Sequence, residues 1–173
     1  MSASFYDISV ASYLQCLGAV AGFLDKGRAH FEERGIPVDE VVETRLYEDM
    51  LPFRFQLVSV VHHSLGALRG IQSGLFQPPP STPDLGYAAL QERVAQARDE
   101  LQRVSPDEVN GLSGKDVVFE LGERKIPFSS ESFVLSFSLP NLYFHAATAY
   151  DILRMKGVPV GKRDFLGQLR IKR

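Results

Sequence analysis

Residues Ser138–Arg154 read S-L-P-N-L-Y-F-H-A-A-T-A-Y-D-I-L-R, and this stretch decides the fold that the sequence predicts. An α-helix advances about 100° per residue, so helical spacing gathers these side chains into two strips on different sides. Because the helix carries core-type residues on more than one side, we expect it to lie inside a bundle of helices. The first strip holds Asn141, His145, Thr148, Ile152 and Met155, and the second holds Leu142, Ala146, Ala149 and Leu153.

His145 is the polar ring in the middle of this predicted helix. A buried polar group without a partner costs roughly 1–3 kcal/mol. The imidazole therefore needs either a hydrogen bond to another helix or a metal ion. The aromatic residues around it are expected to pack in the core rather than to form a ligand cage. They are Phe133, Phe137, Tyr143, Phe144 and Tyr150.

Four long helices are predicted from the spacing of apolar residues and from their capping residues. Pro140 is expected to kink the last helix or to divide it in two. Short helical turns are expected near Pro37 and over residues 105–111. The long helices are Ser4–Arg34, a second from Asp49 or Pro52 to Gly74, a third from Ser81 or Thr82 to Val104, and Glu131–Lys156.

A change of pattern precedes the last helix. The segment K-D-V-V-F-E-L-G-E-R-K-I-P-F alternates around L-G-E-R, which predicts a β-hairpin over Asp116–Pro127. A hairpin alone is marginal in water and must lean on the helices. The sequence therefore predicts an all-α fold, a four-helix bundle with a small β-hairpin before the last helix, as a single domain over residues 1–173.

The second predicted helix carries two adjacent histidines, His62 and His63. Neighbouring residues on a helix point about 100° apart, so the two rings are not expected to serve one site. We favour His62 pointing inward, with His63 in a packing or interface stripe.

Composition removes several classes of function. The formal net charge of −2 and the absence of a basic block disfavour nucleic-acid binding. The single Cys16 excludes an internal disulfide, and its apolar surroundings favour a buried, inert thiol. No signal peptide is recognised, and no apolar segment is expected to reach the ~20 residues that span a bilayer. We expect a cytoplasmic protein that binds neither nucleic acid nor membrane.

Several stretches resemble one known group of proteins. They are F-Y-D (5–7), R-L-Y-E-D-M-L-P (45–52), F-E-L-G-E-R-K-I-P-F (119–128) and, most specifically, the run from Ser138 to Gly167. Together they resemble an uncharacterised branch of the DinB/YfiT-like superfamily, a group of proposed metalloenzymes. The resemblance implies an up-down-down-up four-helix bundle, often dimeric. In better-studied members a divalent metal lies between helices two and four, and some of them transfer or isomerise groups with a low-molecular-weight thiol.

The superfamily's metal site uses one histidine on the second helix and an H-x-x-x-H pair on the last. Here His62 or His63 matches the first ligand and His145 the second, whereas Ala149 stands where the third belongs. The metal that the resemblance implies is a divalent ion such as Zn or Ni. A catalytic zinc generally takes three protein ligands, so a further donor would be needed. Glu48, Asp49, Asp151 and the phenol of Tyr47 are the candidates.

Two hypotheses follow. The first is a dimeric bundle with a degenerate metal site, which binds a small molecule or a partner between its helices. The alternative is a metal- and thiol-dependent transferase or isomerase with His62 or His63 and His145 as metal ligands. We expect a homodimer because Gly18 and Gly22 thin one face of the first helix and because the superfamily is often dimeric.

Overall fold

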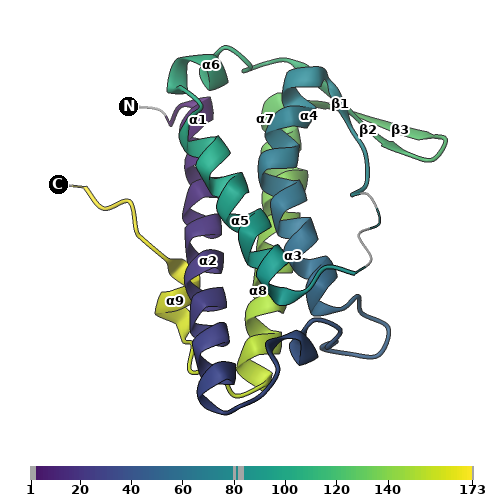
Figure 1. The fold of residues 1–173 in the computed structure, drawn as a ribbon. Helices are drawn as coiled ribbons and strands as arrows, with labels where there is room; N and C mark the ends of the chain where they lie inside the picture. Colours follow the sequence, from purple (N-terminus) through teal and green to yellow (C-terminus); the bar gives the residue numbers. More distant parts are fainter. Residues whose placement is uncertain (1–2, 80, 82–83, 173) are drawn as a thin grey trace.

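The computed structural model describes residues 3–79, 81 and 84–172. Most of this chain is helical, and one small sheet lies at the end of the molecule where α4 ends (Figure 1). The long helices run side by side, and α9 with the C-terminal segment lies against α2.

The first long helix begins as predicted. A short helix α1 (Phe5–Ile8) leads into α2 (Val10–Glu33). The Ser4 hydroxyl caps α1 by accepting a hydrogen bond from the Asp7 main-chain amide, and the Asp7 carboxylate accepts one from the Ser4 main-chain amide. A 3₁₀ turn, η1 (Val38–Val41), follows near Pro37.

The second long helix is one continuous unit of three parts. They are α3 (Phe53–Val61), the π-helical turn η2 (His62–Gly66) and α4 (Ala67–Ser73). Gly74 ends it in the left-handed conformation, with φ 77°. The predicted bounds are therefore confirmed, but the π-turn at the two histidines was not foreseen.

Helix α5 (Tyr87–Gln102) starts later than predicted. Its N-cap is Gly86 rather than Ser81, while Thr82 and Pro83 lie outside the described residues. The Tyr87 amide donates to the Asp39 carboxylate at 2.7 Å, so a side chain from η1 supplies the cap. The expected turn over residues 105–111 is confirmed as α6 (Pro106–Asn110).

The predicted hairpin is part of a larger sheet. Strands β2 (Asp116–Leu121) and β3 (Arg124–Ser129) pair antiparallel, with Val118 opposite Pro127. A short strand β1 (Leu75–Phe76) pairs in parallel with β2, which gives the order β1-β2-β3. The sequence missed β1 because the two residues after Gly74 are too few to show a strand pattern.

The last helical unit, like the second, combines α-helical and π-helical parts. It consists of α7 (Ser130–Phe133), the π-turn η3 (Val134–Ser138) and α8 (Leu139–Met155), followed by a short helix α9 (Lys162–Leu166). The backbone stays in the right-handed helical region through Ser138 and Leu139, so Pro140 lies inside a continuous helical unit and the division that the sequence allowed does not occur. Its missing amide leaves a main-chain carbonyl of the preceding turn without a helical donor.

The core lies between α2, α3, α5 and α8. Helix α3 packs on α8 and α5, while α2 packs on α5 and α8. The expectation that the aromatic residues near His145 form the core is right for Phe133, which is fully buried. It is wrong for Tyr143 and Phe144, which are 44% and 56% exposed because the outer side of α8 is left open.

The expectation about apolar length also needs correction. The unit Phe5–Glu33 is long and apolar enough to cross a membrane, with a mean hydropathy of 1.4 over its best window. However, 56% of that window is buried inside the structure. Burial of this kind is typical of a core helix in a globular fold.

Candidate functional site

His63 is the histidine that points inward. Its ring is 6% exposed, and its Nδ1 atom has no hydrogen-bond partner among the described residues. The preference for His62 as the inward ring is therefore wrong. Gln56 and Ser59, two turns and one turn before His63 on the same side of the helix, are also buried, so this polar side faces the core.

His145 meets His63 and Gln56. The two imidazole rings lie 5.8 Å apart between centroids with their planes at 14°. The Nδ1 atom of His145 lies 2.8 Å from the Gln56 Oε1. Because the amide nitrogen of Gln56 donates to the Leu51 carbonyl, its oxygen faces the ring, and His145 donates from Nδ1. The expected hydrogen bond between His145 and another helix is confirmed.

His62 turns away from this pair. Its Nε2 atom lies 2.8 Å from the carbonyl oxygen of Gln77, and its ring lies 4.4 Å from that of Phe76 between centroids. It therefore ties the π-turn to the chain that follows β1.

The pKa of each of the three imidazole rings lies below that of free histidine. Burial, together with the smaller effects of the neighbouring His62 and His145, lowers the pKa of His63 to about 3. Burial alone lowers the pKa of His145 to about 4. The pKa of His62 is also lowered by burial. The pair at the centre is neutral near pH 7, where it can accept or donate hydrogen bonds but cannot serve as a general acid.

The residues present do not fit a metal held by three protein ligands. Within the described part of the chain, no group of three His, Cys, Asp or Glu side chains comes close enough to hold an ion. Ala149 is fully buried at the position of the missing ligand. The alternative donors Glu48, Asp49 and Asp151 are exposed, as is Tyr47.

Cys16 is 7% exposed, and burial raises the pKa of its thiol to about 12. A protonated, enclosed thiol is a poor nucleophile. The inert thiol that the sequence predicted agrees with this environment.

A buried polar chain next to His63 was missed by the sequence. Tyr13 on α2 lies 2.9 Å from the Ser138 hydroxyl, which donates to the main-chain oxygen of His63 at 2.7 Å. Ser138 closes η3 and His63 belongs to η2, so one hydroxyl joins both π-turns to α2. A π-turn rearranges main-chain acceptors, but neither turn could be read from residue types alone.

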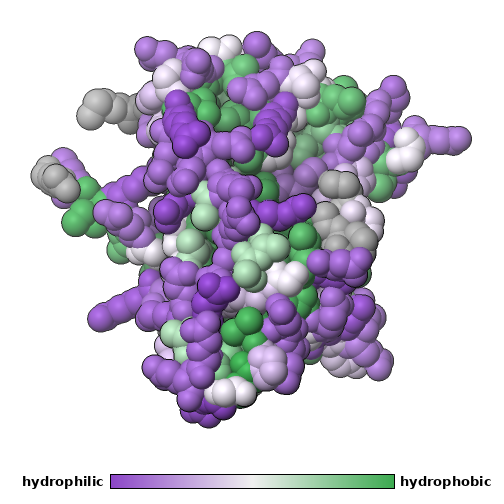
Figure 2. Space-filling model, in the orientation of Figure 1, coloured by the Kyte–Doolittle hydropathy of each residue, from purple (hydrophilic) through white to green (hydrophobic). Residues whose placement is uncertain are grey.

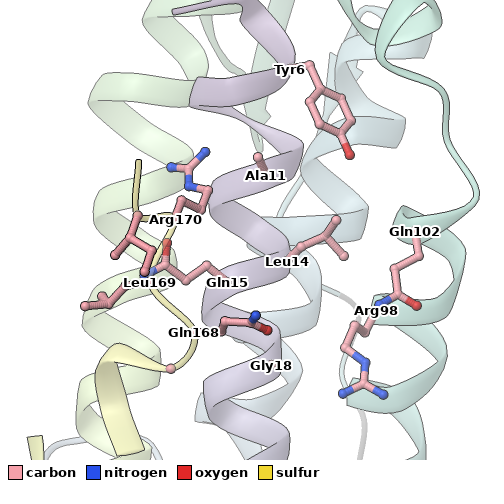
Figure 3. A pocket seen from close by; sticks show the side chains of 12 residues that line it. Tyr6, Ala11, Leu14, Gln15, Gly18, Arg98, Gln102, Gln168, Leu169 and Arg170 are labelled. Carbon is pink, nitrogen blue, oxygen red and sulfur yellow. The ribbon is translucent and has the colours of Figure 1, made fainter. Parts of the chain in front are cut away.

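A second candidate site is a trough along the outer side of α2, with a volume of about 920 Å³. We call it the α2 trough. Helix α2 forms its floor, α5 one wall, and residues 167–171 of the C-terminal tail the other (Figure 3). The side chains of Arg98 and Gln102 project from α5 and line the trough (Figure 3). Figure 2 shows mainly polar side chains on this face, with small apolar patches between them.

The tail is anchored beside α2. The side-chain amide of Gln15 donates to the main-chain carbonyl of Leu166 at 3.0 Å, and the Arg170 guanidinium donates to the main-chain carbonyl of Asp7 at 2.9 Å. Gly167 has φ +62°, and a Cβ there would lie 3.1 Å from the Cβ of Ala19. The wall of the trough therefore depends on glycine at one point of close approach.

Comparison with known proteins places this geometry in a family. The family model Domain of unknown function (DUF1993) matches residues 5–166. A solved structure of a DinB family member from Shewanella denitrificans superposes with a TM-score of 0.79 at 24% identity, covering 97% of this chain and 94% of that one. No curated protein matches the chain significantly. The chain belongs to the DUF1993 family, and its fold is like that of the DinB family member.

Proposed function

We propose that this protein is a small-molecule-binding helical bundle without a catalytic metal, and that the histidine pair has a structural role. In this proposal α2, the α3–α4 unit, α5 and α8 are the four members of an up-down-down-up bundle in a cytoplasmic protein. The observation that carries it is the 2.8 Å contact between His145 and Gln56. This hydrogen bond uses one ring nitrogen of His145. The cluster also offers only two imidazoles, His63 and His145, where a catalytic zinc generally needs three protein ligands.

The alternative is a metal- and thiol-dependent transferase or isomerase. One observation favours it: Nδ1 of the buried His63 has no partner among the described residues. Such an atom is satisfied by an unseen water or by a metal ion.

Elemental analysis separates the two functions. Wild-type protein and His145→Ala are purified without chelator, and zinc and nickel are measured per chain. The proposal expects far less than one equivalent in both proteins. One equivalent in the wild type that is lost from His145→Ala would establish the metal site and overturn the structural role of the pair.

We also propose a homodimer, with the contact on the outer side of α8 rather than at Gly18 and Gly22. A two-fold contact brings the same patch of both copies together. Gly18 lies in the α2 trough beside Arg98 and Arg170, so pairing there would oppose like charges. On α8 the large side chains of Tyr143, Phe144 and Met155 are 44–56% exposed.

A further inference from the structure

The charges that line the α2 trough are all of one sign. Arg98 and Arg170 line it, and none of the described residues that line it carries a carboxylate. Arg170 already donates to the Asp7 carbonyl and the Ser12 hydroxyl. The pKa of the Asp7 carboxyl is lowered mainly by hydrogen bonds from Ser4 and to a smaller extent by the charge of Arg170. Arg98 forms no ion pair with any described residue, and its Nε atom is buried without a partner. Its guanidinium is thus the cation in the trough that lacks an anion.

Apolar groups line parts of the trough, among polar side chains such as Gln15 and Gln102. Leu14 points from α2 toward α5 (Figure 3), and Gly18 leaves the floor bare. Leu169 and Ile171 on the tail wall are 55% and 74% exposed. A cation close to the apolar positions of the floor, Leu14 and Gly18, complements a molecule with an anionic head and an apolar body.

We propose that the α2 trough binds a free amphipathic carboxylate, with its head on Arg98 and its apolar chain along α2 past Gly18. This rests on the proposed binding function and names its site and ligand class. The volume of about 920 Å³ lies at the upper end of the range for small-molecule sites. A guanidinium presents two parallel N–H groups to a carboxylate, which fixes the orientation of the ligand.

The first test concerns the head group. Decanoate and the uncharged decanol are titrated into wild-type protein, Arg98→Gln and Arg93→Gln by calorimetry. Arg93 is exposed on the same helix and does not line the trough, so it controls for net charge. Arg98→Gln is expected to weaken decanoate binding roughly tenfold or more, because a charge-assisted hydrogen bond is lost. Decanol binding and the Arg93→Gln variant are expected to be unchanged.

The second test concerns the apolar floor and uses two matched glycines. A Cβ at Gly18 or at Gly22 meets nothing within 4 Å, so a side chain at either position begins in open space. Only Gly18 lines the trough. Gly18→Leu is expected to melt no lower than the wild type and to lose decanoate binding, whereas Gly22→Leu binds as the wild type does.

Several outcomes overturn the proposal. They are wild-type protein that takes up no decanoate, equal binding by the two leucine variants, and Arg98→Gln that binds like Arg93→Gln. A dimer that becomes monomeric only in Gly18→Leu would assign the trough to a second copy. Binding to anionic vesicles but not to free decanoate would assign it to a membrane surface. Metal content is measured separately, so a failed titration leaves the metal-free histidine pair standing.

Discussion

His63 sets the response of the protein to acid. Its pKa is about 3 in the fold, below the ordinary 6.5, so the unfolded chain binds a proton at this ring that the folded chain does not. The free energy of unfolding therefore falls as the pH drops from 6.5 toward 3, because protonation of this ring favours the unfolded chain. The loss is at most about 1.4 kcal/mol per pH unit for one such ring.

The measurement is denaturant unfolding between pH 7 and about 5, above the range where most carboxylates titrate. Wild-type protein should lose stability along this series. His63→Gln, which cannot titrate at this position, should retain only the part of the slope that His62 and His145 contribute. Equal slopes in the two proteins would contradict a neutral, buried His63.

Cys16 gives a second prediction for a single residue. Raising the pKa of the thiol from 9.0 to about 12 leaves roughly a thousandfold fewer thiolates near neutral pH. A disulfide reagent should therefore label the folded protein very slowly at pH 8 and the denaturant-unfolded protein within minutes. Fast labelling of the folded protein would show that the thiol is accessible and would revive thiol chemistry at this position.

The elements meet at Ser138, where one hydroxyl bonds η2, η3 and α2 together. Ser138→Ala leaves the Tyr13 phenol and a main-chain oxygen of His63 unpaired in the core. We expect a loss of about 1–3 kcal/mol in the free energy of unfolding. Ser136→Ala, an exposed position in the same π-turn, is the control and should change stability by no more than about 0.5 kcal/mol.

Gly167 controls the placement of the tail. Its backbone has φ 62° and ψ −148°, a conformation that is essentially restricted to glycine. Gly167→Ala also places its Cβ 3.2 Å from the Gln15 carbonyl oxygen. We expect the tail to leave α2, seen as faster hydrogen exchange at residues 168–171. Gly161→Ala, where a Cβ meets nothing within 4 Å, should leave exchange unchanged.

The sequence predicted elements better than it predicted their local deviations. Apolar spacing gave the long helices, because it reports which side of a helix is covered. It placed the two histidines wrongly, because the polar and small residues that share the side of His63 did not mark that side as facing the core. The start of α5 was missed for a different reason: Asp39, which caps it, lies 48 residues away. The sequence did indicate one difference from the superfamily's metal site, since Ala149 stands where its third ligand would be expected.

The exposed outer side of α8 predicts that the protein is a homodimer. Light scattering at micromolar concentration should give twice the chain mass of 19.3 kDa. Phe144→Ser should give the monomer without loss of helicity, because Phe144 is 56% exposed in the single chain. A monomeric wild type would remove the dimer, and a dimer that withstands Phe144→Ser would place the contact elsewhere.

The cap on α5 has a consequence for the order in which the chain becomes structured. The amide of Tyr87 finds its acceptor on Asp39, so the first turn of α5 has no local means of satisfying that amide. The turn can become firm only after the chain around residue 39 has docked, and it should fray whenever that segment lifts away. The two regions thus open and close as one cooperative unit, although a long helix and a loop separate them in the chain.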